Sequence, residues 1–189
     1  EACRLEGSTT HFSERQGTLA VPRSGLMLDF DIITSTRKPL LTDRQYYRLA
    51  GALTAALQRD IDFSQANARV GTPNSIQEAR LHIFFIIKPA ALPVAGVQGA
   101  HDPQTPQNYK YGIHILVPGV KLGRAYKKWL LRQFRADPAV IATLRELGAV
   151  GDPAECLDQN SASVPVLFFG SCKRGGTPYV LGAALEVTL

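Results

Sequence analysis

Hydrophobic and polar residues follow a strand-like pattern early in the chain. Between Gly25 and Ile33 an apolar run is interrupted by acids at alternate positions, Asp29 and Asp31. This is the pattern of a buried strand that has one polar edge. Because side chains two positions apart on a strand point the same way, both carboxylates are expected on one face.

Further periodic segments predict the remaining elements. Thr42-Asp43 is typical of a helix start, and apolar residues recur at helical spacing from there to about residue 60. Apolar runs predict strands over 79–88, 110–117, 164–169 and 179–189, and helical spacing predicts helices over 124–136 and 140–147. Pro118-Gly119 is expected to end the strand before it. The segment 92–108, rich in Pro, Gly and Gln, is expected to be a long mobile loop.

The order of these elements indicates the fold class. Strands that alternate with helices, with few tight hairpins between them, favour an α+β (α/β) fold with helices on one face of the sheet. The order is compatible with an RRM-like mixed sheet and flanking helices. A chain of 189 residues suits one domain over 1–189, and it begins with Glu rather than Met. We therefore expect a single domain excised from a longer, multidomain protein.

Composition narrows the setting of the protein. Hydrophobic residues make up 45% and charged residues 20%, as in ordinary globular domains, and the net charge of +5 slightly favours polyanionic partners. Three cysteines without a CxxC pair support neither a disulfide framework nor a zinc site. No apolar run approaches the length of a membrane span, and no signal peptide opens the chain. We expect a soluble, intracellular protein with no membrane partner.

The Asp29-Phe30-Asp31 strand is the first candidate site. Hard divalent cations such as Mg²⁺ and Mn²⁺ prefer carboxylate oxygens, and two such ions can activate a 3′-hydroxyl and stabilise a leaving pyrophosphate. Unpaired charges within an apolar strand are costly, which favours a role in binding metal. The alternative is a strand edge that carries two solvated acids.

A single histidine lies in the apolar strand predicted over 110–117. Gly112 permits close backbone approach of a ligand beside His114, and Lys110 could bring charge to a phosphate. The alternative for His114 is a hydrogen-bonded core residue.

The third candidate is Leu157-Asp158 together with the turn after the strand over 164–169. That turn contains Ser171, Lys173 and Arg174 between glycines. A hydroxyl and two cations in a small turn are suited to holding a triphosphate or a primer backbone. The turn lacks the spacing of a P-loop, and a basic surface hairpin is the alternative.

The order of these three candidates resembles the archaeo-eukaryotic primase superfamily, most of all the primase domains of poxvirus-type and other large DNA virus primase-helicases. The resemblance implies the archaeo-eukaryotic primase fold and a two-metal site for Mg²⁺ or Mn²⁺. The residues that it assigns are the catalytic metal ligands Asp29, Asp31 and Asp158, and the nucleotide-binding residues His114, Lys110, Ser171, Lys173 and Arg174. Asp152 is the nearest competitor of Asp158.

Two positions depart from the pattern of the superfamily. Gly112 stands where Ser is frequent, and Leu167-Phe168-Phe169 replaces an arginine expected shortly before the Gly-Ser-x-Lys turn. Arg174 or Arg37 is a candidate substitute for that arginine. The zinc module of related primases is not visible, so we infer no zinc in these residues.

The resemblance implies a function in DNA replication. The expected activity is synthesis of short primers on a single-stranded DNA template from NTPs or dNTPs, with a helicase fused to or associated with the primase. For a viral protein the setting would be the host cell. The alternatives are a primase-polymerase of damage tolerance or plasmid replication, and a non-catalytic RRM-like nucleic-acid-binding domain. The second is less favoured because the sequence lacks the exposed aromatic pair of an RNA-binding sheet.

The helix predicted over 124–136 carries cations and no acids. Its expected nucleic-acid-binding face consists of Arg124, Lys128, Arg132 and Arg135. Leu122, Ala125, Trp129 and Gln133 are expected on the opposite face, with Trp129 in core packing rather than base stacking.

Overall fold

The computed structural model describes residues 13–14, 23–35, 37, 41–61, 80–94, 108–162, 166–167, 169–172 and 177–189. The strands are β1 (Ser13–Glu14), β2 (Arg23–Thr34), β3 (Arg80–Ile87), β4 (Leu92–Pro93), β5 (Tyr109–Gly123), β6 (Val166–Leu167) and β7 (Val180–Thr188). The helices are α1 (Asp43–Gln58), α2 (Arg124–Arg135) and α3 (Pro138–Glu146), with the short 3₁₀ helices η1 (Pro153–Cys156) and η2 (Gln159–Ala162).

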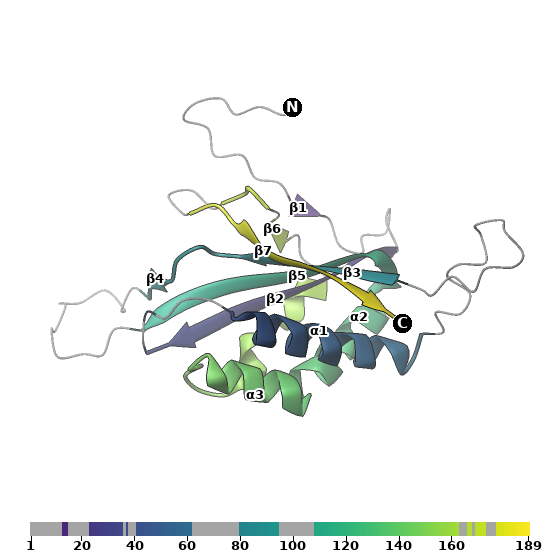
Figure 1. Ribbon diagram of the computed structural model, residues 1–189, viewed down its shortest axis with the longest axis horizontal. Helices are drawn as coiled ribbons and strands as arrows, with labels where there is room; N and C mark the ends of the chain where they lie inside the picture. The colour runs from purple at the N-terminus through teal and green to yellow at the C-terminus, as the bar shows by residue number, and fades with distance from the viewer. Residues whose placement is uncertain are drawn as a thin grey trace, which may run out of the picture.

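A five-stranded sheet organises the molecule. Its strand order is β2-β5-β3-β7, with β4 paired to β5. In Figure 1 the helices α1, α2 and α3 lie together on one side of this sheet, and the small β1–β6 pair lies on the other side. We call the face turned away from the three helices the outer face.

Side chains along each strand point alternately to the face covered by the helices and to the outer face. In β2, Leu28 and Phe30 belong to the core, and the Phe30 ring meets the Phe134 ring of α2 edge to face at 6.1 Å. In β3, Phe85 makes a similar contact with Tyr46 of α1 at 4.9 Å. Because neighbouring residues on a strand point to opposite faces, Asp29 and the other intervening residues lie on the outer face.

Local signals fix the ends of the helices. The Gln45 side chain accepts a hydrogen bond from the backbone N–H of Thr42 at 2.8 Å, at the start of α1. At the start of α3, Asp137 accepts one from the backbone N–H of Ala139 at 2.8 Å. These side chains satisfy backbone donors that the first turn of a helix leaves without partners.

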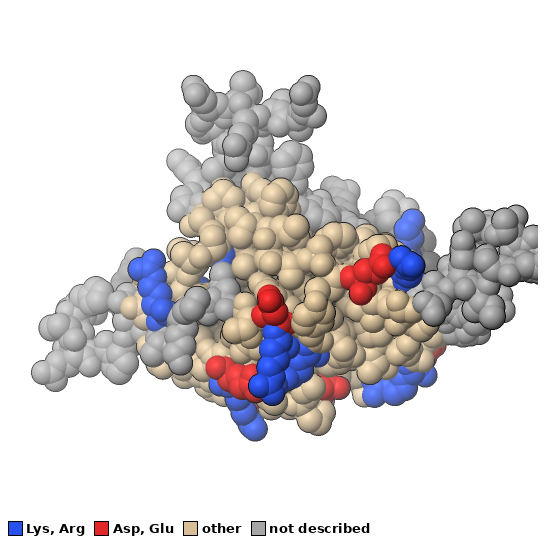
Figure 2. All heavy atoms as spheres, in the orientation of Figure 1, with Lys and Arg blue, Asp and Glu red and all other residues tan. Residues whose placement is uncertain are grey.

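An ion pair joins α1 to α3. Arg48 donates to Glu146 at 2.7 Å, and this hydrogen bond lowers the pKa of the Glu146 carboxyl below its ordinary value. Figure 2 shows Lys and Arg side chains beside Asp and Glu side chains over the helical part of the described surface. Charges of both signs therefore share this side of the molecule.

The strand over 110–117 does not end at Pro118-Gly119, contrary to the expectation from the sequence. β5 continues to Gly123, and consecutive residues of β2, Gly25 and Leu26, pair with Lys121 and Val117. Residues 118–120 therefore form a bulge, where a proline without an N–H is tolerated because no ladder hydrogen bond is needed there.

The packing face of α2 also differs from the prediction. The buried residues are Lys127, Leu130, Leu131 and Phe134, whereas Ala125 and Gln133 are exposed. Trp129 is partly buried and packs against the core, as expected. The prediction was wrong because it placed Ala125 and Gln133 on the packing face, which is instead formed by Lys127, Leu130, Leu131 and Phe134. Lys127 donates to the backbone oxygen of Gly25 at 2.5 Å.

The α+β class with helices on one face is confirmed, and every described strand pair is antiparallel rather than of mixed direction. The strand expected over 164–169 is represented by β6, which pairs with β1 instead of joining the main sheet. Most of the segment 92–108 lies outside the described residues. Within the described part of the chain, no helix is long and apolar enough to cross a membrane.

Candidate active site

The two acids of β2 stand on the outer face, as the alternation of the sequence predicts. The Asp29 side chain is 22% exposed and the Asp31 side chain 44% exposed. Both belong to β2, an edge strand of the main sheet whose outer edge carries the isolated bridges Phe30–Leu157 and Thr34–Ala149. The pair is therefore held on a rigid element, with Asp31 more open to solvent than Asp29.

Asp158 reaches the same site from a distant part of the chain. Leu157 forms an antiparallel bridge with Phe30, and the backbone N–H of Asp158 donates to the backbone oxygen of Asp29 at 2.9 Å. Opposing residues in such a pair share a face, with Cβ atoms about 5 Å apart. Since Leu157 and Phe30 are both in the core, Asp158 and Asp29 lie together on the outer face.

The Asp158 carboxylate also has a local role. Its Oδ1 accepts a hydrogen bond from the backbone N–H of Asn160 at 2.8 Å, at the start of η2. The competing acid, Asp152, instead caps η1 by accepting from the backbone N–H of Ala154 at 2.9 Å. The chain thus brings Asp158 next to Asp29 and gives Asp152 a capping role.

His114 faces Asp29 across the sheet. The two residues are direct partners in the pairing of β5 with β2, and His114 Nε2 lies 3.2 Å from Asp29 Oδ1. This distance is within the range of an ion pair, but Asp29 Oδ1 is buried and has no hydrogen-bond partner. A buried carboxylate oxygen of this kind is an energetically costly group that a bound cation would satisfy.

Lys110 pairs with the second acid. Its Nζ lies 2.7 Å from Asp31 Oδ2, and both side chains are nearly half exposed. Exposed ion pairs contribute at most about 1 kcal/mol to stability. This contact therefore brings the Lys110 ammonium group to the site but does not hold it there rigidly.

Tyr179 and Lys88 complete the site, although the sequence analysis assigned neither of them. The Tyr179 ring stacks on the His114 ring with centroids 4.2 Å apart, and Lys88 Nζ lies 4.1 Å from the Tyr179 ring centre. Burial, together with the charges of Asp29 and Asp31, raises the pKa of the Tyr179 hydroxyl well above its ordinary value. Tyr179 therefore stays neutral and holds the imidazole in one plane.

The small residue at Gly112 makes room for this tyrosine. A Cβ atom at position 112 would lie 2.7 Å from the Tyr179 hydroxyl oxygen. We expected Gly112 to permit a close ligand, and in the structure the close approach is made by Tyr179. A signal in the sequence was available, because a strand glycine often marks a position that another group approaches closely.

The turn after β6 is only partly described. Ser171 is fully buried, and its backbone oxygen accepts from the N–H of Tyr179 at 3.0 Å. The backbone N–H of Gly170 in turn donates to the oxygen of Tyr179 at 2.9 Å. The segment 169–171 is thus tied to Tyr179 and His114. Lys173 and Arg174 lie outside the described residues.

The predicted cationic face of α2 is not next to these acids. Arg124, Lys128 and Arg132 are exposed and Arg135 is partly exposed. They belong to the helical layer, on the opposite side of the sheet from the acids (Figure 1). Arg37 is exposed, and it is not among the residues whose contacts define the site.

The donor set fits divalent cations in part. Carboxylate oxygen is the preferred ligand of Mg²⁺ and Mn²⁺, and Asp29 offers a buried oxygen that lacks a hydrogen-bond partner. Within the described residues, however, no three His, Cys, Asp or Glu side chains form a ready ligand group. The structure therefore places Asp29, Asp31 and Asp158 on one face of the sheet, but their side chains do not converge on a single metal position.

Comparison with known proteins identifies the family of the chain. The family model described as the C962R protein N-terminal AEP domain matches residues 1–185 of the chain. The chain therefore belongs to the archaeo-eukaryotic primase (AEP) domains, and within them to this family. The superfamily resemblance inferred from the three motifs is confirmed.

The curated relatives are viral proteins. The chain is 34% identical over 188 residues to "Putative primase C962R" of African swine fever virus isolate Pig/Kenya/KEN-50/1950, and equally to the protein of the same name from isolate Warthog/Namibia/Wart80/1980. Each alignment covers 99% of this chain and 16% of the relative. The chain thus corresponds to a small part of these longer proteins.

Proposed function

We propose that this chain is the catalytic domain of a DNA-replication primase that makes short primers on single-stranded DNA from NTPs or dNTPs. The observation that carries the proposal is the strand register around Asp29, which aligns His114 on one side and Asp158 on the other. Membership of an AEP family and relatives that bear the name of primase support the same activity.

Asp29, Asp31 and Asp158 would hold the divalent cations. Two such ions would supply activation of the 3′-hydroxyl for attack on the α-phosphate and stabilisation of the leaving pyrophosphate. The buried oxygen of Asp29, which lacks a hydrogen-bond partner, is the strongest single indication that a cation belongs there.

The neighbouring side chains would position the triphosphate. His114 cannot turn freely, because it is 2% exposed and stacked on Tyr179, so its Nε2 edge stays beside Asp29. Lys110 lies at the exposed end of the same group of residues and can contribute its charge to phosphate oxygens. A side chain held in place like that of His114 needs little reorganisation when charge develops on the substrate.

The single-stranded template and an associated helicase are parts of the proposal that rest on the family resemblance. The cations of α2 provide a surface that could follow template phosphates, with affinity that falls as salt rises. Because α2 lies on the helical layer, this template path would have to run around the sheet from the acids.

Substitution of the β2 acids tests the proposal. Asp29→Asn and Asp31→Asn keep side-chain size and remove a negative charge. We expect incorporation of labelled NTPs or dNTPs on unprimed single-stranded DNA, with Mg²⁺ or Mn²⁺, to fall by at least about 100-fold, because the ions stabilise the transition state by several kcal/mol.

Asp152→Asn is the matched control. Its Oδ1 caps η1, and asparagine caps a helix as well as aspartate, so this variant should synthesise primers at the wild-type rate. Retained synthesis in both β2 variants would rule out the assignment. Extension of primed DNA without synthesis on unprimed template would favour the primase-polymerase alternative.

A further inference from the structure

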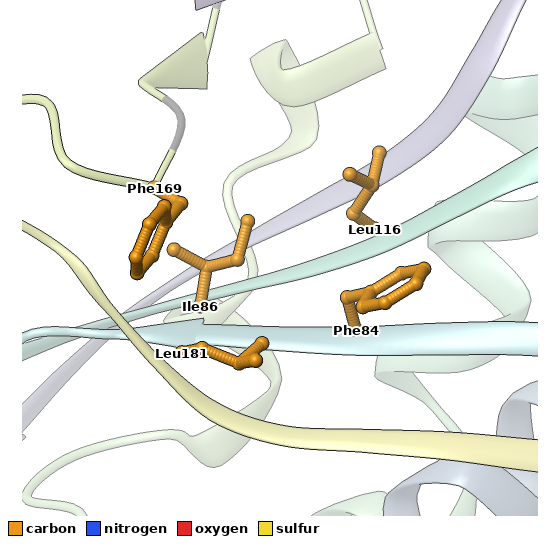
Figure 3. A pocket seen from close by; sticks show the side chains of 5 residues that line it. All are labelled: Phe84, Ile86, Leu116, Phe169 and Leu181. Atoms are coloured by element: carbon orange, nitrogen blue, oxygen red, sulfur yellow. The ribbon is translucent and has the colours of Figure 1, made fainter.

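An apolar hollow lies on the outer face next to the candidate active site. Its volume is about 300 Å³. It is lined by Phe84 and Ile86 of β3, Leu116 of β5, Leu181 of β7, and Phe169 from the segment after β6. Figure 3 shows the Phe169 ring standing beside Ile86 and Leu181, with Phe84 and Leu116 farther along the sheet.

The hollow is continuous with the residues that would hold the phosphates. Ile86 is the direct sheet partner of His114, and Phe84 is the partner of Leu116, which follows His114 on the same face of β5. Paired residues lie about 5 Å apart and alternate residues on a strand about 7 Å apart. A single nucleotide with its phosphates beside His114 is therefore long enough to reach the hollow with its base.

The side chains that line the hollow favour a ligand with a flat, partly polar ring. Two phenyl groups, Phe84 and Phe169, stand among aliphatic side chains, and all five lining residues are apolar. Nucleobases stack on aromatic side chains through their faces, whereas their edges carry the hydrogen-bonding groups. A base enclosed entirely by apolar groups would lose those hydrogen bonds, but this hollow is partly open to solvent.

The exposure of the lining supports a ligand rather than ordinary core packing. Phe169 is 61% exposed and Leu181 is 51% exposed, although large apolar side chains are normally covered. The volume lies at the small end of the range for ligand sites, which suits one base better than an extended chain.

We propose that this hollow is the binding site for the base of the incoming nucleoside triphosphate, an inference that rests on the proposed function. The base lies against Phe84 and Phe169, and its hydrogen-bonding edge faces outward. Because the lining offers the edge no polar group, the site accepts all four bases with similar affinity. The template, and not the protein, then selects the nucleotide.

Equilibrium binding of ATP and of ribose 5-triphosphate, which lacks the base, tests this inference. The protein is the 189-residue chain with Mg²⁺. Wild type should bind ATP more tightly than ribose 5-triphosphate. Phe169→Ala should weaken ATP binding by about 10-fold, the effect of losing one stacked base, and should leave ribose 5-triphosphate unchanged. The affinities for GTP, CTP and UTP should fall by the same factor in this variant.

Tyr47→Ala is the matched control. Tyr47 is an aromatic residue of α1 that is 65% exposed and lies in the helical layer, so its removal should change neither affinity. Phe84→Leu, which keeps an apolar side chain in the partly buried position, should weaken ATP binding in the same direction as Phe169→Ala.

The result that overturns the inference is an unchanged ratio of ATP to ribose 5-triphosphate affinity in Phe169→Ala. That result would assign the hollow to packing against another segment or partner. Lack of any ATP binding by wild type would also overturn it. A protein that binds ATP through Phe169 but makes no primers would instead contradict the proposed function and leave the base site standing.

Discussion

Two acid–base pairs organise the site at the level of single residues. Asp29 faces His114, and Asp31 is paired with Lys110. The first pair is largely buried and leaves one carboxylate oxygen without a hydrogen bond, whereas the second is exposed and exchangeable. The unsatisfied oxygen is an energetically costly feature for a structural strand to retain, and a cation-binding role explains it.

Gly112 is the residue on which the packing of the site depends most directly. Gly112→Ala places a Cβ atom 2.7 Å from the Tyr179 hydroxyl, closer than packed atoms approach one another. We expect a loss of about 1–3 kcal/mol in the free energy of unfolding, measured by urea denaturation, because the tyrosine must move off His114.

Two further variants separate this contact from a general effect of alanine. Gly119 belongs to the same strand, and a Cβ atom at that position would meet nothing within 4 Å, so Gly119→Ala should be close to neutral. Adding Tyr179→Phe to Gly112→Ala removes the crowded oxygen and should restore much of the stability. Equal destabilisation by both glycine variants, or no recovery in the double variant, would contradict this account.

At the scale of elements, α2 combines a surface of cations with one buried cation. Lys127 is 1% exposed and donates to the Gly25 backbone oxygen, close to the bulge that separates the two halves of the β2–β5 pairing. The helix is thereby attached to the sheet by a polar contact as well as by its apolar residues.

Lys127→Ala should therefore destabilise the protein. We expect a loss of about 2–4 kcal/mol in the free energy of unfolding, since the variant leaves a cavity and removes the donor to a buried carbonyl. Thermal or urea unfolding measures it. The neighbouring exposed lysine gives the control: Lys128→Ala should change stability by less than about 0.5 kcal/mol. Similar values for the two variants would show that Lys127 has no special role.

The elements that the sequence predicted well are those whose signals are local. β2, β3 and α1 carry clear periodicities and a helix start, and the structure has them within a few residues of the expected bounds. The continuation of β5 through Pro118 and the burial of Lys127 depend on partners far away in the chain. Periodicity in one segment contains no information about such partners.

The same distinction applies to the site. The face shared by Asp29 and Asp31 follows from strand geometry alone, and their alignment with Asp158 was anticipated only through the family resemblance. Tyr179 and Lys88 were missed because folding brings them to His114 from the segments that flank β7 and β3.

At the scale of the whole molecule, the two sides of the sheet differ in character. The helical side holds the core and a surface of mixed charge, whereas the outer face gathers the acids, His114 and the apolar hollow. Segments separated by more than a hundred residues meet on that face, where the backbone N–H of Asp158 donates to the backbone oxygen of Asp29. A nucleotidyltransferase site on this chain would therefore form only when the sheet has folded and brought these distant segments together.

Primer synthesis by Asp158→Asn is the most direct test of this central claim. Asparagine retains the side-chain oxygen that accepts from the Asn160 N–H, so the turn into η2 and the melting temperature should be preserved. The charge needed to hold a divalent cation is removed. The account predicts that synthesis on unprimed single-stranded DNA is lost while thermal stability stays at the wild-type level. Wild-type synthesis by a stably folded Asp158→Asn protein would contradict it.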